Sequence, residues 1–147
     1  MANPLIAQGT LNRLRASVTW ASNPGLNVTA SFLGREGIRL ALQGESITYI
    51  PTMTGAIQSP EPYMQIELTL HLLKTQALSS SYKRQMETNA TIGDGTVRPD
   101  VASGLDAYQI VNCGIRSVRE LNFSGEDAGF AVVIGGYYLV NSSLFGF

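Results

Sequence analysis

An alternation of apolar and polar side chains runs through residues 63–72 and then gives way to a helical pattern. Methionine, isoleucine or leucine takes every even position, while polar residues or tyrosine take the odd ones, as a strand with one buried face requires. From Leu78 the apolar spacing becomes four residues, with Tyr82 and Met86 following. The pattern predicts a strand followed by one amphipathic helix at about residues 75–90, the only helix we expect.

The two-residue period also appears earlier in the chain. Even positions are apolar over residues 14–20 and again over 26–32, which predicts two half-buried strands on either side of a turn at 23–25. A third alternation covers 38–42, and we expect residues 47–50 to pair back on it as a hairpin.

The second half of the chain predicts two more strand regions. Glycines flank Asp94 in a segment that is typical of a loop. Residues 107–122 predict one or two strands with a bulge near Cys113, where the apolar parity shifts. Residues 129–140 are apolar on both faces, which indicates a strand that is covered on both sides.

Together these elements predict a mainly β (α+β) fold. We expect two packed antiparallel sheets, forming a sandwich or flattened barrel, with one flanking α-helix at about residues 75–90. The 147 residues, 44% of them hydrophobic, suit a single domain over 1–147. Residues 43–62 carry three prolines and predict an extended arm or loop. Sheet edges in such a chain must be closed, covered or paired with neighbours.

The charge content is low. Only 14% of the residues are charged, against about 25% in ordinary domains. Two interpretations are open: the surface is buried against other copies, because interface cores are depleted of charge, or this is a small, tight β domain rich in Ser, Thr, Asn and Gly. The net charge of −1 gives no basic footprint for nucleic acid. Without a spanning segment or a signal-peptide pattern, we expect a soluble chain made in a cytoplasm, with no membrane contact.

Candidate chemistry is sparse. His71 is the only histidine, and Glu67 lies four residues away, about 13 Å along a strand, which is too far for a catalytic dyad. Cys113 is the only cysteine, so an internal disulfide is excluded and one thiol with one histidine cannot build a zinc site. Arginine pairs such as Arg116 with Arg119 lie near carboxylates or alternate along strands, which favours solvated faces or intersubunit salt bridges. We therefore expect no enzyme and no catalytic, cofactor or metal site.

The order of these elements resembles a known family. The resemblance is carried by the strand at 63–73, the Lys74-Thr75 junction, the helix at 76–89, the strand pair at 108–118, the N-terminal residues 3–5 and 9–14, and the closing strand at 135–140. The chain is similar over nearly its whole length to the tail tube proteins of contractile-tailed bacteriophages. More distantly, it resembles the tube proteins of type VI secretion systems and of pyocins.

The resemblance implies a structural protein of the virion tail that is assembled in the host cytoplasm. Subunits would form hexameric rings that stack into a hollow tube, with strands joining across the ring into an inner barrel. The arm at about 43–62 would bridge adjacent rings. The implied partners are further copies of the chain, the tail sheath, the baseplate and the tape-measure protein, while phage DNA would pass through the lumen during ejection without specific binding.

A lumen of this kind needs neutral or acidic groups, because basic side chains would pair with phosphates and hold the DNA. Two predicted strand faces qualify: one comprises Asn27, Thr29 and Ser31, and the other comprises Gln65, Glu67 and Thr69. Parity leaves open whether either face lines the lumen or meets the outside or another subunit.

Other functions stay open. A tube-initiating baseplate protein or a type VI tube subunit would share the fold. A monomeric ligand-binding β-barrel is the alternative from another class and would need an apolar cavity. An enzyme would need His71 or Cys113 to take part in the chemistry.

Overall fold

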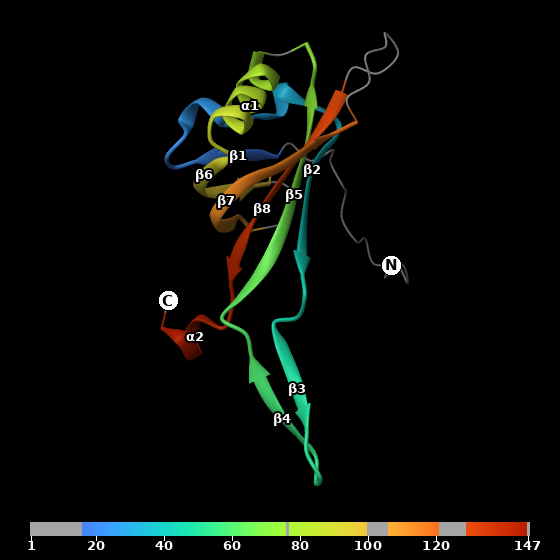
Figure 1. The fold of residues 1–147 in the computed structure, drawn as a ribbon, viewed down its shortest axis with the longest axis vertical. Helices are drawn as coiled ribbons and strands as arrows, with labels where there is room; N and C mark the ends of the chain where they lie inside the picture. Colours follow the sequence, from blue (N-terminus) through green and yellow to red (C-terminus); the bar gives the residue numbers. More distant parts are fainter. Residues whose placement is uncertain (1–15, 76, 100–105, 121–128, 147) are drawn as a thin grey trace, which may run out of the picture.

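A computed structural model describes residues 16–75, 77–99, 106–120 and 129–146, the side chains of residues 30 and 35 excepted. Eight strands in this part of the chain form two antiparallel sheets: six strands in the order β1-β6-β7-β8-β5-β2, and a separate pair, β3-β4 (Figure 1). The strands are β1 (Ser17–Trp20), β2 (Leu33–Gln43), β3 (Ile47–Pro51), β4 (Ala56–Pro60), β5 (Tyr63–Leu73), β6 (Thr91–Arg98), β7 (Tyr108–Arg119) and β8 (Gly129–Leu139). The helices are α1 (Ala77–Thr88) and α2 (Ser142–Phe145), with 3-10 turns η1 (Pro24–Leu26) and η2 (Ala30–Phe32).

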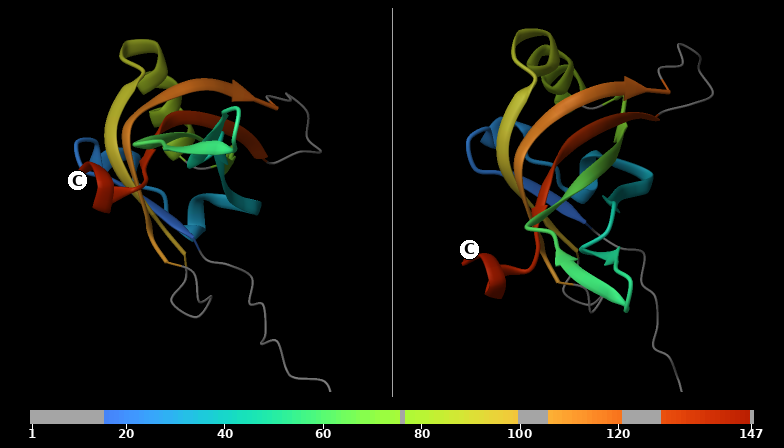
Figure 2. Two further views of the ribbon diagram at one scale, coloured as in Figure 1. Left: turned by 90° about the horizontal axis from the view of Figure 1, so that it is seen from below. Right: turned by 60° about the horizontal axis from the view of Figure 1, so that its bottom comes forward.

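The six-stranded sheet curls strongly around one hydrophobic core, and α1 lies at one end of it (Figure 2). The smaller sheet does not form a second layer over the core but projects from the far end of the larger one (Figure 1). The predicted class, mainly β with two antiparallel sheets and one main flanking helix, is confirmed.

The strand-to-helix switch is confirmed as β5 followed by α1. In β5 the even positions from Ile66 to Leu72 are buried, while the odd positions stay exposed or half-buried. In α1 the hydroxyl of Tyr82 is buried, donates to the carbonyl of Leu26 at 2.7 Å and accepts from the indole Nε1 of Trp20 at 3.1 Å. Burial raises the pKa of Tyr82 well above its usual value, and the Trp20 hydrogen bond offsets only part of that rise. The helix is thus tied to the core by hydrogen bonds as well as by packing.

The second predicted strand, over residues 26–32, is wrong. The chain forms η1 and η2 there, with a single β-bridge between Val18 and Val28. The Trp20 amide donates to Oδ1 of Asn27 at 2.8 Å and not to a backbone carbonyl, so the ladder cannot extend beyond the bridge. Asn27 therefore does not belong to a strand face.

The predicted pairing of residues 47–50 with 38–42 is also wrong. β3 pairs with β4, while β2 pairs with β5. The continuous alternation of β5 makes a long partner for β2, and the turn at Gly44, which has a φ of +85°, directs the chain away from the sheet. Residues 43–62 thus contain a two-stranded hairpin.

The glycine-flanked Asp94 lies within β6 and not in the predicted loop. Gly93 has a φ of +83°, Asp94 accepts from the amide of Asn112 at 3.0 Å, and a Cβ on Gly95 would collide with the indole of Trp20. The opposite bulge in β7 is confirmed, because its register shifts between Val111 and Gly114. The glycines therefore serve a kinked strand and its packing.

Candidate functional site

One face of the larger sheet is polar, and the sequence-predicted residues of β5 lie on it. Gln65, Glu67 and Thr69 alternate with the buried core residues, so their side chains share the face away from the core. Nε2 of Gln43 in β2 donates to Oε2 of Glu67 at 2.9 Å. The structure thus brings three of the six predicted residues together on one surface.

The other three predicted residues lie elsewhere. Asn27, Thr29 and Ser31 belong to the irregular segment around η1 and η2. Oδ1 of Asn27 is occupied by the Trp20 amide, and the hydroxyls of Thr29 and Ser31 are hydrogen-bonded to each other at 2.9 Å. These side chains make hydrogen bonds within or close to the irregular segment and do not form a strand face.

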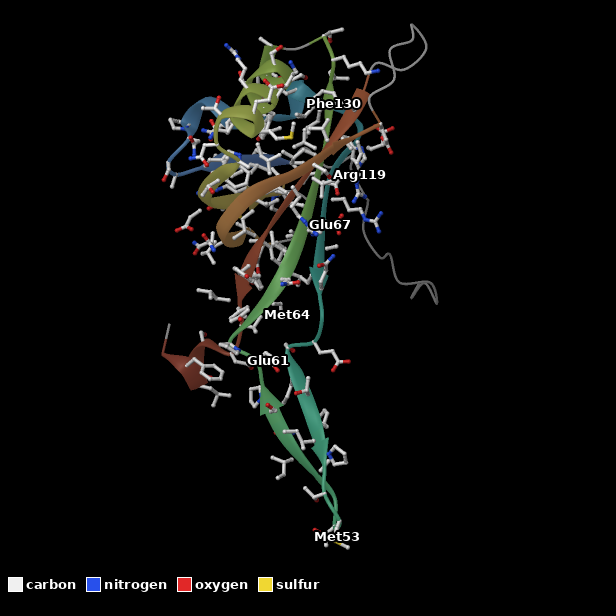
Figure 3. All side chains as sticks on the ribbon, viewed as in Figure 1. Met53, Glu61, Met64, Glu67, Arg119 and Phe130 are labelled. Atoms are coloured by element: carbon white, nitrogen blue, oxygen red, sulfur yellow. The ribbon has the colours of Figure 1, made fainter. Side chains whose placement is uncertain are left out.

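The polar face is more basic than the sequence indicated. A cavity of about 300 Å³ lies on it, and its wall includes Arg39 of β2, Glu67 and His71 of β5, Arg119 at the end of β7, and Glu120. Glu67 and Arg119 are labelled in Figure 3. Within the described residues, no salt bridge joins either arginine to a carboxylate. The face therefore carries both signs of charge, and it differs from the neutral or acidic face that we expected.

Two strand edges that border this face are open. β2 is the last strand of the sheet, and no described strand pairs with its outer side. β7 pairs with β6 only as far as Gly114, and the amide of Ile115 still donates to the carbonyl of Ala90 at 2.8 Å. Beyond that point β7 pairs with β8 alone. The strand run β2-β5-β8-β7 is thus unpaired along the outer side of β2 and, on its other side, only over residues 116–119 of β7.

The hairpin β3–β4 presents a second surface. Residues 47–60 contain no charged side chain, and Met53 lies at the tip (Figure 3). The side chains of Tyr49, Ile50 and Ile57 are 60%, 54% and 58% exposed. Exposed apolar groups gathered on a projection of this kind are typical of a protein–protein contact.

An apolar groove lies between β2 and the ends of β6 and β7. It has a volume of about 290 Å³, and its wall includes Leu40 and Leu42 of β2, Val97 of β6 and Tyr108 of β7, with one acidic group, Asp106. The groove marks the seam where the curled sheet does not close on itself.

The two groups considered for chemistry lie apart. His71 lies on the polar face, whereas Cys113 belongs to the hydrophobic core. Burial, with a smaller contribution from the negative charge of Asp94, raises the pKa of Cys113 to about 12, so its thiol is protonated at neutral pH. His71 and Cys113 therefore do not form a catalytic pair.

Among the described residues, no three His, Cys, Asp or Glu side chains are arranged to hold a metal ion. Neither helix of the described chain combines the length and the apolar character that crossing a membrane takes.

Two features of these surfaces were missed from the sequence. The open edge of β7 depends on where β6 ends, which strand periodicity does not encode. Asn141, which bonds the base of the hairpin, lies 80 residues from Glu61 in the sequence. Its only sequence signal was an asparagine directly after a strand, a common position for a left-handed residue.

A scan against protein-family models finds no match, and a search of curated protein sequences finds no match either.

Proposed function

We propose that this chain is the structural subunit of a bacteriophage tail tube, which forms stacked hexameric rings and conducts DNA. The observation that carries the proposal is the strand run β2-β5-β8-β7, in which the outer edge of β2 is unpaired and the edge of β7 is unpaired over residues 116–119. All its neighbours are antiparallel, so β2 and β7 run in opposite directions. When copies are related by rotation, β2 of one copy meets β7 of the next as an antiparallel pair. This joint is head-to-tail and closes into a ring.

The size of such a ring suits the proposed function. Six copies of four strands give a barrel of about 24 strands, with a circumference of about 115 Å at ~4.8 Å per strand. The corresponding diameter of about 37 Å, before strand tilt widens it, leaves room for a DNA duplex. Barrels of fewer strands already enclose aqueous channels.

The polar face is the proposed lumen, because the other face of the same strands is buried in the core. Gln65, Glu67 and Thr69 then form the middle of each subunit's lumen surface. Arg39 and Arg119 lie on β2 and β7, the strands that join between copies. The mixed charge limits net attraction of phosphates, so DNA slides and does not bind tightly.

The hairpin is the proposed contact between stacked rings. It is uncharged and apolar, and it extends well beyond the sheet (Figure 1). Contact with the next ring would cover side chains that are exposed in the single chain.

The outer surface would meet the sheath, and the tube ends would meet the baseplate and the tape-measure protein. We place assembly in the host cytoplasm and the final location in the virion tail.

Negative-stain microscopy of the purified chain tests this proposal. Tubes support it, whereas a tube-initiating baseplate protein would stop at single rings, and a monomer would refute it. A type VI tube subunit would also polymerise, and DNA ejection by assembled particles separates the two.

Cysteine cross-linking tests the joint itself. In a Cys113→Ala background, Ser117→Cys in β7 is combined with a cysteine at 39, 41 or 43 of β2. We expect one of these combinations to give a ladder of oligomers up to the hexamer on a non-reducing gel. Thr19→Cys with Ser117→Cys is the matched control, since β1 is not at the proposed joint, and it should give no ladder. If the control with a cysteine in β1 gives the same ladder as the variants with a cysteine in β2, the proposed pairing of β2 with β7 is wrong.

A ligand-binding barrel is the second candidate, and the apolar groove beside Leu40 is the observation that favours it. Its volume of about 290 Å³ lies at the lower limit of small-molecule sites. A monomer that binds an apolar dye, and loses that binding in Leu40→Asp, would favour this function over the tube.

A further inference from the structure

The hairpin β3–β4 is attached to the rest of the molecule through its base. No strand of the larger sheet pairs with β3 or β4. The chain enters through residues 44–46 and leaves through residues 61–62, and Gly44 has a φ of +85°. The direction of the hairpin therefore depends on how these two connections are held.

A third segment of the chain joins the two connections. Nδ2 of Asn141, just beyond β8, donates to the carbonyl of Ser46 at 2.9 Å and to the carbonyl of Glu61 at 2.7 Å. The amide of Glu61 donates to the same Ser46 carbonyl at 2.9 Å, and the amide of Val140 donates to the carbonyl of Pro62 at 3.2 Å. The segment that follows β8 is thus bonded to both connections.

The chemistry of this junction specifies asparagine. A primary amide has two N–H groups, and here each is directed to a different connection. The backbone of Asn141 is left-handed, with φ 54° and ψ 41°, which asparagine tolerates better than most residues. Aspartate would fit the backbone but would direct a carboxylate at two carbonyl oxygens. Glycine would keep the backbone and remove both donors.

We infer that Asn141 is a positioning residue that fixes the direction of the hairpin for docking on a second copy of this chain. This inference rests on the proposed function, in which the hairpin tip reaches the next ring. Six hairpins must engage together, so a shared direction reduces the conformational entropy that stacking costs. The residue acts through the hairpin and touches no partner itself.

Pulsed EPR tests the inference without requiring a tube. Spin labels are attached to Met53→Cys at the hairpin tip and to Thr88→Cys at the end of α1, in a Cys113→Ala background diluted with unlabelled protein. We expect one narrow distance distribution in this parent and at least about a twofold broader one after Asn141→Gly. Asn141→Asp serves as the second variant should the glycine variant not fold, and we expect it to broaden the distribution too.

Asn112→Gly is the matched control. Asn112 is also left-handed, with a φ of 53°, but it lies in β7, and its backbone amide makes the bond to Asp94. This variant should leave the distribution unchanged. The inference is overturned if the distance distribution of Asn141→Gly or Asn141→Asp is as narrow as that of the parent and has the same centre.

Microscopy separates this inference from the proposed function. If the parent forms tubes, Asn141→Gly should give mostly unstacked rings at the same concentration, with circular dichroism and melting temperature preserved. If the parent forms neither rings nor tubes, the proposed function fails, and the EPR comparison still decides whether Asn141 directs the hairpin. Tubes of normal length from Asn141→Gly overturn the docking role even if the distribution broadens.

Discussion

Removing the apolar pair on one face of the hairpin should weaken ring stacking without affecting the fold of the subunit. Ile50 and Ile57 are directly paired across β3 and β4. Their side chains are 54% and 58% exposed, so both are available to a partner. The proposed perturbation is the double change Ile50→Ser with Ile57→Ser.

The magnitude follows from the exposed fraction. Fully burying an isoleucine contributes about 1.5–3 kcal/mol, and slightly more than half of each side chain is still exposed to water. The pair therefore contributes about 1.5–3 kcal/mol per hairpin when both become covered. At about 1.4 kcal/mol per factor of ten, the concentration needed for tube growth should rise at least about tenfold. The melting temperature of the subunit should change by less than about 2 °C, because exposed positions contribute little to stability.

A pelleting assay measures this critical concentration directly, with negative-stain images of the supernatant. Ile50→Val with Ile57→Val is the matched control and should polymerise nearly as the parent does. Leu144→Ser, at a side chain that is 64% exposed in α2, controls for loss of apolar surface away from the hairpin. Tube growth at the parent concentration in the serine variant would refute the reasoning, because the hairpin face would then not be covered in the tube.

Three further outcomes are expected. Glu67→Lys should leave assembly intact but reduce infectivity, because added positive charge in the lumen retains DNA; normal infectivity would exclude Glu67 from the lumen. Tyr82→Phe leaves the Leu26 carbonyl and the Trp20 indole without their buried partner and should lower the free energy of unfolding by about 1–3 kcal/mol in urea titrations. The thiol of Cys113, with a pKa of about 12, should resist iodoacetamide at pH 8 until the protein unfolds. Rapid alkylation of the native protein would contradict this protection. Because the pKa of the thiol is higher in the folded than in the unfolded state, its contribution to the free energy of unfolding should be complete below about pH 8.5 and decline as the pH rises toward 12.

Sequence periodicity predicted the parts of this fold in which long-range packing and local pattern agree. The even residues of β5 are buried because they pack into the hydrophobic core, and pairing with β2 and β8 fixes which face of the strand points there. The same alternation over 26–32 did not give a strand, because Oδ1 of Asn27 accepts the hydrogen bond from the Trp20 amide that the backbone of a partner strand would otherwise accept. Local polar competition of this kind does not appear in an apolar–polar count.

Candidate surfaces were harder to predict than strands. Glu67 was identified from the sequence, but Arg39 and Arg119 reach the same face only through pairing with β5 and β8. Likewise, β3 pairs with β4 after a chain reversal near Gly55, whereas the sequence predicted that residues 47–50 would pair with 38–42. Which strands pair, and in which register, decides these surfaces, and the apolar–polar pattern of a single strand does not specify either.

The projection of the hairpin also determines how ring stacking can be followed in solution. A two-stranded ribbon with water on both faces is marginally stable, so the amides of β3 and β4 should exchange with deuterium far sooner than those of β5 and β8 in the free subunit. Docking would slow that exchange. Exchange at the hairpin would therefore report ring stacking separately from ring formation, which involves the edges of β2 and β7.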